Sequence, residues 1–285
     1  MLNIDLHSHS TVSDGLLSPE ELVQRAAARG VKVLALTDHD DTGGLGAARA
    51  AALRCGVHLI YGVEISVSWN TQTLHVVGLD IDPAHPGLLR GLQSIRSSRA
   101  GRAQRIAAEL KKIGIHDALE GAYVHAGNPG LIGRTHFARY LVEQGHASDV
   151  HEVFKKFLVP GKPGYVEHRW AALADAVDWI NASGGLAVMA HPGRYPINSK
   201  QMRQLLAEFK QSGGAAVEVV TGSHQPEQYA VFARYAQEFG LLASAGSDFH
   251  GPGESRRDLG RLPELPLGCA PVWEQLTGLE FVARS

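Results

Sequence analysis

The first indication of the fold is the segment Asp5-Leu-His7-Ser-His9-Ser-Thr-Val-Ser-Asp14-Gly15, near the start of the chain. Residues 2–6 alternate as in a short strand, and successive side chains of a strand point to opposite faces, so His7 and His9 share one face. Two neutral imidazoles at one strand end suit a divalent metal ion, and Asp14 could add a carboxylate. The alternative is a pair of exposed histidines on a mobile N-terminus, because His-x-His alone is a weak motif.

Length and composition favour a globular enzyme. The chain has 285 residues, of which 44% are apolar and 20% charged, which allows one large α/β domain or a barrel with an inserted subdomain. The sequence contains no run of about 18 apolar residues that would predict a membrane span, and no secretory signal is expected. Only Cys55 and Cys269 are present, too few for a disulfide framework, so the expected location is the cytoplasm.

The charges are distributed unevenly. The net charge of −2 argues against a polycation built for nucleic acid, and no stable duplex partner is expected. Residues 89–165 nevertheless carry 12 Lys/Arg against 6 Asp/Glu, which leaves 15 of the 27 Lys/Arg and 23 of the 29 Asp/Glu elsewhere. The acidic regions on either side predict bound metal ions, and the basic middle section predicts the binding of a small anionic substrate. The alternative is that solvated faces happen to segregate.

Helices and strands alternate on both sides of this middle section. Ser18-Pro19-Glu20-Glu21 is typical of a helix start, with Ser as N-cap and Glu three residues later. Strands are expected over residues 2–6, 33–37, 57–67, 73–80, 186–190, 215–220 and 241–245. Helices are expected over residues 19–29, 43–54, 170–182, 199–211 and 226–239. Strand–helix alternation with short connections predicts parallel βα units.

The middle section departs from this rhythm. Residues 87–112 are helical in pattern and rich in arginine, and further helical pieces follow at 134–144 and 148–157, with Gly/Pro-rich breaks between them. We therefore predict a barrel formed by residues 1–88 and 166–285, and a mostly helical, basic insertion over residues 89–165.

Potential metal ligands follow the predicted strands one after another. In parallel barrels, functional groups collect at the C-terminal ends of the strands. The candidates are His7, His9, Asp14, His39, Glu64, His75, His191, Asp248 and His250. Six imidazoles and three carboxylates are too many for one ion, and suit two or three divalent ions. Nitrogen and oxygen donors of this kind fit Mn²⁺, Zn²⁺ or Fe²⁺ better than Ca²⁺, and clustered ions indicate hydrolytic catalysis.

These motifs resemble those of the PHP (polymerase and histidinol phosphatase) family. They are His7-x-His9 with Asp14, Thr37-Asp-His39-Asp40, Gly62-Val-Glu64, His75, Ala190-His191-Pro192 and Ser247-Asp248-Phe-His250. The resemblance covers roughly residues 1–88 and 166–285. It implies a distorted (β/α)7 TIM-like barrel, related to the amidohydrolases, with three metal ions and phosphoesterase activity.

The resemblance also implies how the ligands are shared. One ion would be held by His7, His9, Glu64 and Asp248, a second by Glu64, His75 and His191, and a third by Asp14, His39 and His250. Mn²⁺ is the expected metal, with Zn²⁺ and Fe²⁺ as alternatives.

Basic residues of the insertion and of two barrel loops are candidates for substrate binding. Arg99, Arg102 and Arg105 follow one another at intervals of three on a predicted helix. Arg134-Thr135-His136 opens another helix, whose N-terminus would favour a phosphate. The expected substrate-binding residues are Arg102, Arg105, Arg134, Thr135, Arg194 and His224. Solvated surface charge is the competing interpretation for each of them.

The order of these segments resembles a small bacterial branch of the family that acts on nucleoside 3′,5′-bisphosphates, related members of which trim short 5′-phosphorylated RNA. This implies hydrolysis of the 3′-phosphate, for example of adenosine 3′,5′-bisphosphate, by a metal-bridging hydroxide. His191, Asp248 and His224 are the expected catalytic residues, with His224 as a candidate general acid. The alternatives are a 5′-3′ exonuclease, a histidinol phosphate phosphatase, and a non-enzymatic module attached to a polymerase.

Overall fold

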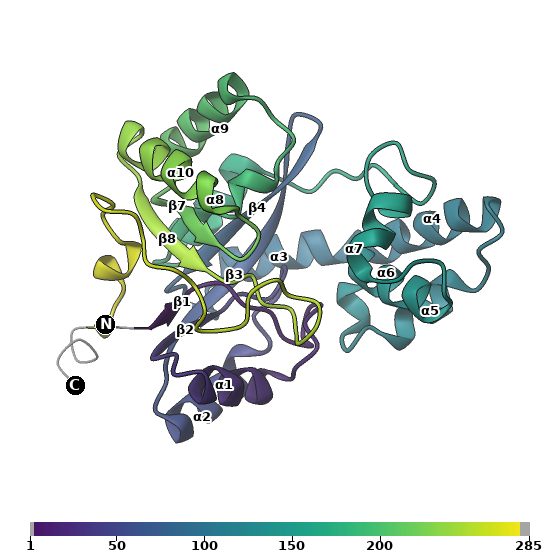
Figure 1. Cartoon of the computed structure of the whole chain (residues 1–285), viewed down its shortest axis with the longest axis horizontal. Coiled ribbons are helices and arrows are strands. Elements are labelled where there is room, and N and C mark those ends of the chain that lie inside the picture. Colours follow the sequence, from purple (N-terminus) through teal and green to yellow (C-terminus); the bar gives the residue numbers. More distant parts are fainter. Residues whose placement is uncertain (1–2, 280–285) are drawn as a thin grey trace.

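The structure, a computed structural model, describes residues 3–279. Leu2 of the first predicted strand and residues 280–285 lie outside the described part. Figure 1 shows a barrel with helices packed around it and a separate group of helices to one side. The strands are β1 (Ile4–Asp5), β2 (Val33–Leu36), β3 (His58–Trp69), β4 (Gln72–Leu79), β5 (Ala171–Ala172), β6 (Leu186–Met189), β7 (Ala216–Thr221) and β8 (Leu242–Gly246).

The described residues form ten α-helices, six around the barrel and four to one side. Around the barrel lie α1 (Pro19–Ala28), α2 (Leu45–Cys55), α3 (Pro86–Ser97), α8 (Leu173–Ala182), α9 (Ser199–Gln211) and α10 (Pro226–Glu238). To one side lie α4 (Arg99–Lys112), α5 (Ala118–Val124), α6 (Arg134–Glu143) and α7 (Val150–Val153), the last continued by a π-helical turn over Phe154–Leu158. The predicted start of α1 is confirmed, since Ser18 and Glu21 form a capping box.

Seven of the strands form a nearly closed barrel in the order β1-β2-β3-β4-β6-β7-β8, and the short β5 pairs with β3 outside this path. The chain just after β1 closes the barrel against β8. The amide of Leu6 donates to the carbonyl oxygen of Ala245 over 3.0 Å, and Ser8 forms a parallel bridge with Phe249. The expected seven-stranded, distorted barrel is therefore confirmed.

The distortion lies in β4, which runs antiparallel to both of its neighbours, whereas the other pairs are parallel. The sequence predicted parallel units only. Trp69 pairs with Gln72, so the connection between β3 and β4 has two residues, which permits a hairpin but is too short for a parallel crossover. Asn70 takes the left-handed conformation that this turn requires (φ 50°). Because β4 is reversed, the first half of this strand lies at the barrel end where the other strands finish.

Three clusters of buried apolar residues hold the molecule together. One lies between the strands and their covering helices, and a second includes inward-facing residues such as Leu6, Val33 and Val188. The third joins α4, α5, α6 and α7 through residues such as Ile106 and Phe137. The helical group therefore has a core of its own.

Helix α3 belongs to the barrel core and leads from the barrel to α4, as Figure 1 shows. Its residues Leu88, Leu92 and Ile95 are buried in the cluster that covers the strands. Gly91 lets α3 approach α8 closely, since a Cβ at this position would lie 2.4 Å from the ring of Trp179. Among the described residues, no helix is both long and apolar enough to cross a membrane.

We predict that Gly91→Ala destabilises the protein by about 1–3 kcal/mol, the usual cost of forcing extra volume into a packed contact. Gly101→Ala is the matched control, because its Cβ would meet no atom closer than 3.8 Å. Replacing a helical glycine by alanine in open space stabilises by roughly 0.5–1 kcal/mol. Urea unfolding followed by tryptophan fluorescence measures both free energies of unfolding. Equal effects of the two substitutions would contradict the close packing of α3 on α8.

Candidate metal centre

The nine candidate ligands meet at one end of the barrel. His7 and His9 follow β1, His39 follows β2, Glu64 lies in β3, and His75 lies in the first half of the reversed β4. His191 follows β6, and Asp248 and His250 follow β8. Three overlapping groups each have their nitrogen and oxygen atoms within 4.8 Å of one another: His9, Asp14, His39 and His250; His7, His9, Glu64 and Asp248; and His39, Glu64 and His75.

Glu64 is the centre of this arrangement and is fully buried. Its Oε2 lies 3.3 Å from Nε2 of His7, 3.3 Å from Nε2 of His9 and 2.9 Å from Nδ1 of His39. Its Oε1 lies 2.9 Å from Nδ1 of His75 and 2.9 Å from Nε2 of His191. One carboxylate therefore faces five histidines from four segments of the chain, a geometry suited to bridging two cations.

Asp14 and Asp248 supply the other two carboxylates. Oδ1 of Asp248 lies 3.5 and 3.3 Å from Nε2 of His7 and His9. Oδ1 of Asp14 lies 3.3 Å from Nε2 of His250 and 3.8 Å from Nε2 of His39. Asp248 holds a left-handed backbone conformation (φ 55°), which costs free energy for a residue other than glycine and is found most often at functional sites.

The polar atoms of this cluster fit divalent cations. In the described part of the chain, seven of the nine residues have a buried nitrogen or oxygen atom with no hydrogen-bond partner: His7, His9, Asp14, His39, Glu64, His75 and His191. Leaving a buried polar atom unpaired costs about 1–3 kcal/mol, so such a concentration indicates a missing binding partner. Imidazole and carboxylate donors together suit Mn²⁺, Zn²⁺ or Fe²⁺.

The carboxylates of the cluster are held ionised. Burial raises the pKa of Glu64, but the surrounding histidines, His75 and His39 first, outweigh it and hold that pKa well below its usual value. Nearby histidines do the same for the pKa values of Asp14 and Asp248. The barrel end therefore presents ionised carboxylates, the form in which a carboxylate binds a cation.

Glu218 supports this cluster and was missed by the sequence analysis. It is buried in β7, where its Oε1 accepts from Nδ1 of His7 over 2.7 Å and its Oε2 accepts from the backbone amide of His191 over 2.5 Å. A carboxylate in this position fixes the ring orientation and tautomer of a metal-binding histidine. The available signal was its position as the only charged residue in the apolar strand of residues 215–220.

A cavity of about 720 Å³ opens beside the cluster. The barrel contributes Asp248, His250 and the loop residues Gly193 and Arg194 to its wall, and the helical group contributes Thr135, Val150, His151, Phe154 and Val159. A volume of this size accommodates a small organic ligand. The helical group is therefore placed to contact whatever binds at the metal ligands.

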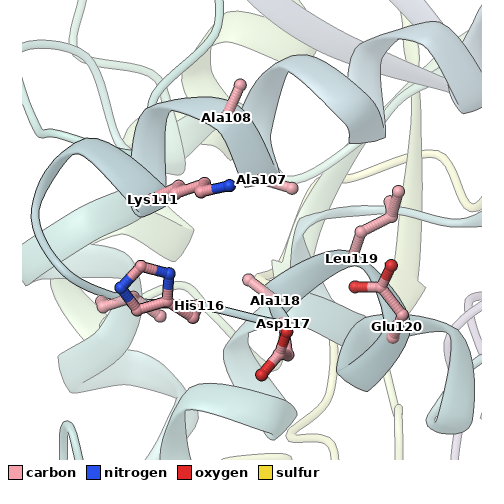
Figure 2. Close-up of a pocket in the computed structure, with 9 residues that line it drawn as sticks. Ala107, Ala108, Lys111, His116, Asp117, Ala118, Leu119 and Glu120 are labelled. Atoms are coloured by element: carbon pink, nitrogen blue, oxygen red, sulfur yellow. The ribbon is translucent and has the colours of Figure 1, made fainter.

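Figure 2 shows a second, smaller cavity of about 270 Å³, between α4 and α5. Lys111, His116, Asp117 and Glu120 line it, together with apolar side chains. None of the nine candidate ligands contributes to its wall, so it is not part of the metal centre.

The predicted basic residues have different surroundings. Arg99 is buried and pairs with Asp40, so it is committed to a structural contact. Arg102 is also buried, 5.0 Å above the ring of Trp170, and no acidic partner for it lies among the described residues. Burial, followed by the charges of Arg134 and Arg99, lowers the pKa of Arg102 to about 9. An anion would relieve this repulsion.

The other three basic candidates differ in their exposure and in their neighbours. Arg105 is exposed and lies 3.4 Å from Nδ1 of His168. Arg134 is half-buried, with its guanidinium 5.5 Å above the ring of Phe154. Arg194 is half-exposed and pairs with Oδ2 of Asp248 over 2.9 Å, at the metal end of the large cavity.

The structure buries His224, the expected catalytic and substrate-binding residue, behind the loop that follows His191. His224 is 3% exposed, and backbone groups engage both of its ring nitrogens. Its Nδ1 donates to the carbonyl oxygen of Val219 over 3.1 Å, and its Nε2 accepts from the amide of Gly193 over 2.9 Å. Burial, with a smaller contribution from Arg194, lowers its pKa to about 4. His224 therefore holds the loop that follows His191.

We predict that His224→Asn affects stability rather than catalysis. Unfolded His224 binds a proton near pH 6.5, whereas the folded residue does so only near pH 4, so the folded state loses stability as the pH falls from about 6.5 to 4. The variant should be less stable by about 1–3 kcal/mol at pH 7.5, with a shallower pH dependence below pH 6.5. Urea unfolding in the presence of a chelator measures this. A fall in kcat of about 100-fold or more would instead place His224 in the chemistry.

The comparisons with known proteins agree with this geometry. The PHP domain model matches residues 5–222. The chain is 52% identical over 276 residues to a 3′,5′-nucleoside bisphosphate phosphatase of Chromobacterium violaceum, covering 97% of each chain. It is 46% identical over 272 residues to the 5′-3′ exoribonuclease Rnm of Escherichia coli, covering 95% of this chain and 92% of that protein.

A solved structure confirms the fold. An amidohydrolase from Chromobacterium violaceum, with bound sulfate and no metal, matches this chain with a TM-score of 0.93 and 52% identity, covering 96% of this chain and 95% of the other. The expected distorted barrel with its helical elements is thus shared with a solved structure. Because the family model matches well over half of the sequence and the relatives match nearly all of it, the chain belongs to the PHP domain family.

Proposed function

We propose that this protein is a metal-dependent phosphoesterase that hydrolyses the 3′-phosphate of nucleoside 3′,5′-bisphosphates, giving a nucleoside 5′-monophosphate and phosphate. One observation carries the proposal: eight candidate ligands converge in overlapping groups, with His191 beside Glu64, next to a cavity whose other wall belongs to a basic helical group. The relative that is 52% identical over 97% of the chain is a 3′,5′-nucleoside bisphosphate phosphatase, which supports the same substrate class.

The cluster would hold three divalent ions. His7, His9, Glu64 and Asp248 would hold the first, Glu64, His75 and His191 the second, and Asp14, His39 and His250 the third. Bound ions of this kind lower the pKa of water to near neutrality and neutralise phosphoryl oxygens. Mn²⁺ is our expected metal, with Zn²⁺ and Fe²⁺ as alternatives for these donors.

The protein's own groups would orient the reacting phosphate. Arg194 reaches the metal end of the cavity, and its ion pair with Asp248 leaves the guanidinium half-exposed. A guanidinium there would bind phosphoryl oxygens and stabilise the charge that develops on them. Glu218 would keep His7 in one orientation and the His191 loop in place. His191 and Asp248, expected to be catalytic, would act through the ions they hold.

The second phosphate would be bound by the helical group α4–α7, which forms most of the insertion predicted over residues 89–165; α3 instead packs in the barrel core. Arg102 is a buried guanidinium with no acidic partner among the described residues, and burying an unpaired charge is costly. Arg134 and Arg105 lie near enough to lower its pKa further. A phosphate at this cluster would receive several charge-assisted hydrogen bonds.

The nucleoside would lie between the two phosphate positions. Phe154 and His151 offer flat surfaces on the helical side of the large cavity, and Val150 and Val159 add apolar contacts there. Thr135 lines the same wall. Aromatic side chains bind bases by stacking, largely independently of base identity, so we infer weak base specificity.

A 5′-3′ exonuclease that acts on short 5′-phosphorylated RNA is the second candidate. The relatives from Escherichia coli and Haemophilus influenzae, 46% and 44% identical, are 5′-3′ exoribonucleases, and both activities need a 5′-phosphate site and a phosphoester at the ions. Histidinol phosphate has only one phosphate and leaves Arg102 unpaired. We also infer a cytoplasmic location, consistent with Cys55 and Cys269 being free.

We predict that the Mn²⁺-loaded protein releases phosphate fastest from adenosine 3′,5′-bisphosphate. The comparison substrates are adenosine 3′-monophosphate, adenosine 5′-monophosphate, histidinol phosphate and a labelled 5′-phosphorylated dinucleotide. The 3′-monophosphate should be about 10- to 100-fold poorer in kcat/KM, because it lacks the 5′-phosphate and the charged hydrogen bonds to it, which are worth about 1.5–3 kcal/mol.

The variant Arg102→Met tests whether Arg102 is the source of this preference. The variant should lose most of the preference for the bisphosphate while keeping the rate on adenosine 3′-monophosphate. Release of intact nucleotides from the dinucleotide at a higher rate than phosphate release would favour the exonuclease. Preference for histidinol phosphate would overturn the proposed substrate.

We predict that Glu218→Gln weakens metal binding about 10- to 100-fold, the usual effect of removing a group that orients a metal ligand. Glutamine has one acceptor oxygen and one NH2 group, so it can accept a hydrogen bond from His7 or from the amide of His191, but not from both. Competition with a chelating dye for Mn²⁺ measures the dissociation constants. Glu227→Gln, on the exposed surface of α10, is the control. Equal affinities of the two variants would show that Glu218 does not orient the ligands.

A further inference from the structure

Helix α6 of the helical insertion is bonded directly to one candidate metal ligand. Oγ1 of Thr135 donates to Oδ2 of Asp14 over 2.8 Å, and Nη2 of Arg139 donates to the backbone carbonyl oxygen of Asp14 over 2.6 Å. Both contacts are buried or partly buried. The insertion therefore fixes the backbone and the side chain of Asp14 together.

The Thr135 hydroxyl determines which oxygen of Asp14 remains available. Oδ2 is occupied by Thr135, whereas Oδ1 is buried without a hydrogen-bond partner among the described residues. Oδ1 faces Nε2 of His250 at 3.3 Å and Nε2 of His39 at 3.8 Å. A carboxylate held in this way presents one oxygen in a fixed direction.

The insertion also holds the segments that carry the two partners of Asp14. Arg139 forms a two-pronged ion pair with Glu254, with both bonds at 2.8 Å, in the loop just after His250. Arg99 pairs with Asp40, the neighbour of His39. All three ligands of this position thus depend on α4 or α6.

The other ion positions are supported from the barrel. Glu218 of β7 holds the ring of His7 and the backbone of His191. Tyr195, in the loop after β6, accepts from the backbone amide of His75 over 3.0 Å. These supports belong to the barrel and do not involve α4 or α6.

We propose that the helical insertion completes the ion position formed by Asp14, His39 and His250, and that Thr135 is a positioning residue for Asp14. This rests on the three-ion site of the proposed function and extends it, because the insertion then controls the affinity of one ion as well as contacting the substrate. The contacts assign Thr135 a role toward the metal in addition to its place on the cavity wall.

The test is a Mn²⁺ titration of chelator-treated protein, with free Mn²⁺ measured by electron paramagnetic resonance and bound metal by elemental analysis. Thr135→Val removes the hydroxyl at nearly constant volume. We expect two ions to bind as in the wild type and the third about 10- to 100-fold more weakly. Thr135→Ser, which keeps the hydroxyl, should restore wild-type binding of all three.

Thr277→Val is the matched control. It also removes a threonine hydroxyl that donates to an aspartate, at 3.0 Å from Asp80, but neither residue belongs to the candidate ligand groups. It should bind three ions as the wild type does.

Three results would overturn the inference: three ions bound by Thr135→Val with wild-type affinities, equal weakening of all three, or only two ions in the wild type. The substrate comparison, run on the same wild-type sample, reports on the proposed phosphoesterase separately. Phosphate release from the bisphosphate by a protein with two ions would leave that function standing while this inference failed.

Discussion

A single buried carboxylate, that of Glu64, is the constraint on which the rest of this molecule depends. It has no access to solvent and faces the ring nitrogens of five histidines, from four segments of the chain, at 2.9–3.3 Å. A charge buried this deeply is stable only with partners around it. Two features of the barrel bring these partners together. Strand β8 closes against the chain after β1, and β4 is reversed.

Much of this could be predicted from the sequence, because the informative patterns are local. Short apolar runs followed by a polar ligand predicted the strands and the barrel end at which His39 and His191 lie. The Ser18 capping box predicted α1, and the arginine-rich pattern after residue 87 predicted a helical insertion. Patterns of this kind involve residues that are close together in the sequence, so they can be recognised without the structure.

The features that escaped prediction depend on contacts between distant segments. The direction of β4 follows from a two-residue turn and from pairing on both sides. In the sequence Glu218 is a single charged residue in an apolar strand, and its contact with His7 is seen only when β7 is placed beside the chain after β1. His224 follows a strand, like the candidate ligands, but its ring forms hydrogen bonds with the backbone of Gly193 and Val219. The bond from Thr135 to Asp14 joins residues 121 positions apart.

Charge explains why two separate regions are needed for a substrate with two phosphates. Glu64, Asp14 and Asp248 are ionised, but the histidines beside them oppose their charge, so the barrel end alone does not attract a phosphate. Divalent ions bound there would add positive charge, and attraction at the barrel end is therefore conditional on metal. The arginines around Arg102 are positive whether or not metal is bound. A monophosphate would satisfy only one of these regions, whereas a bisphosphate would satisfy both, and this difference is the physical basis of the proposed selectivity.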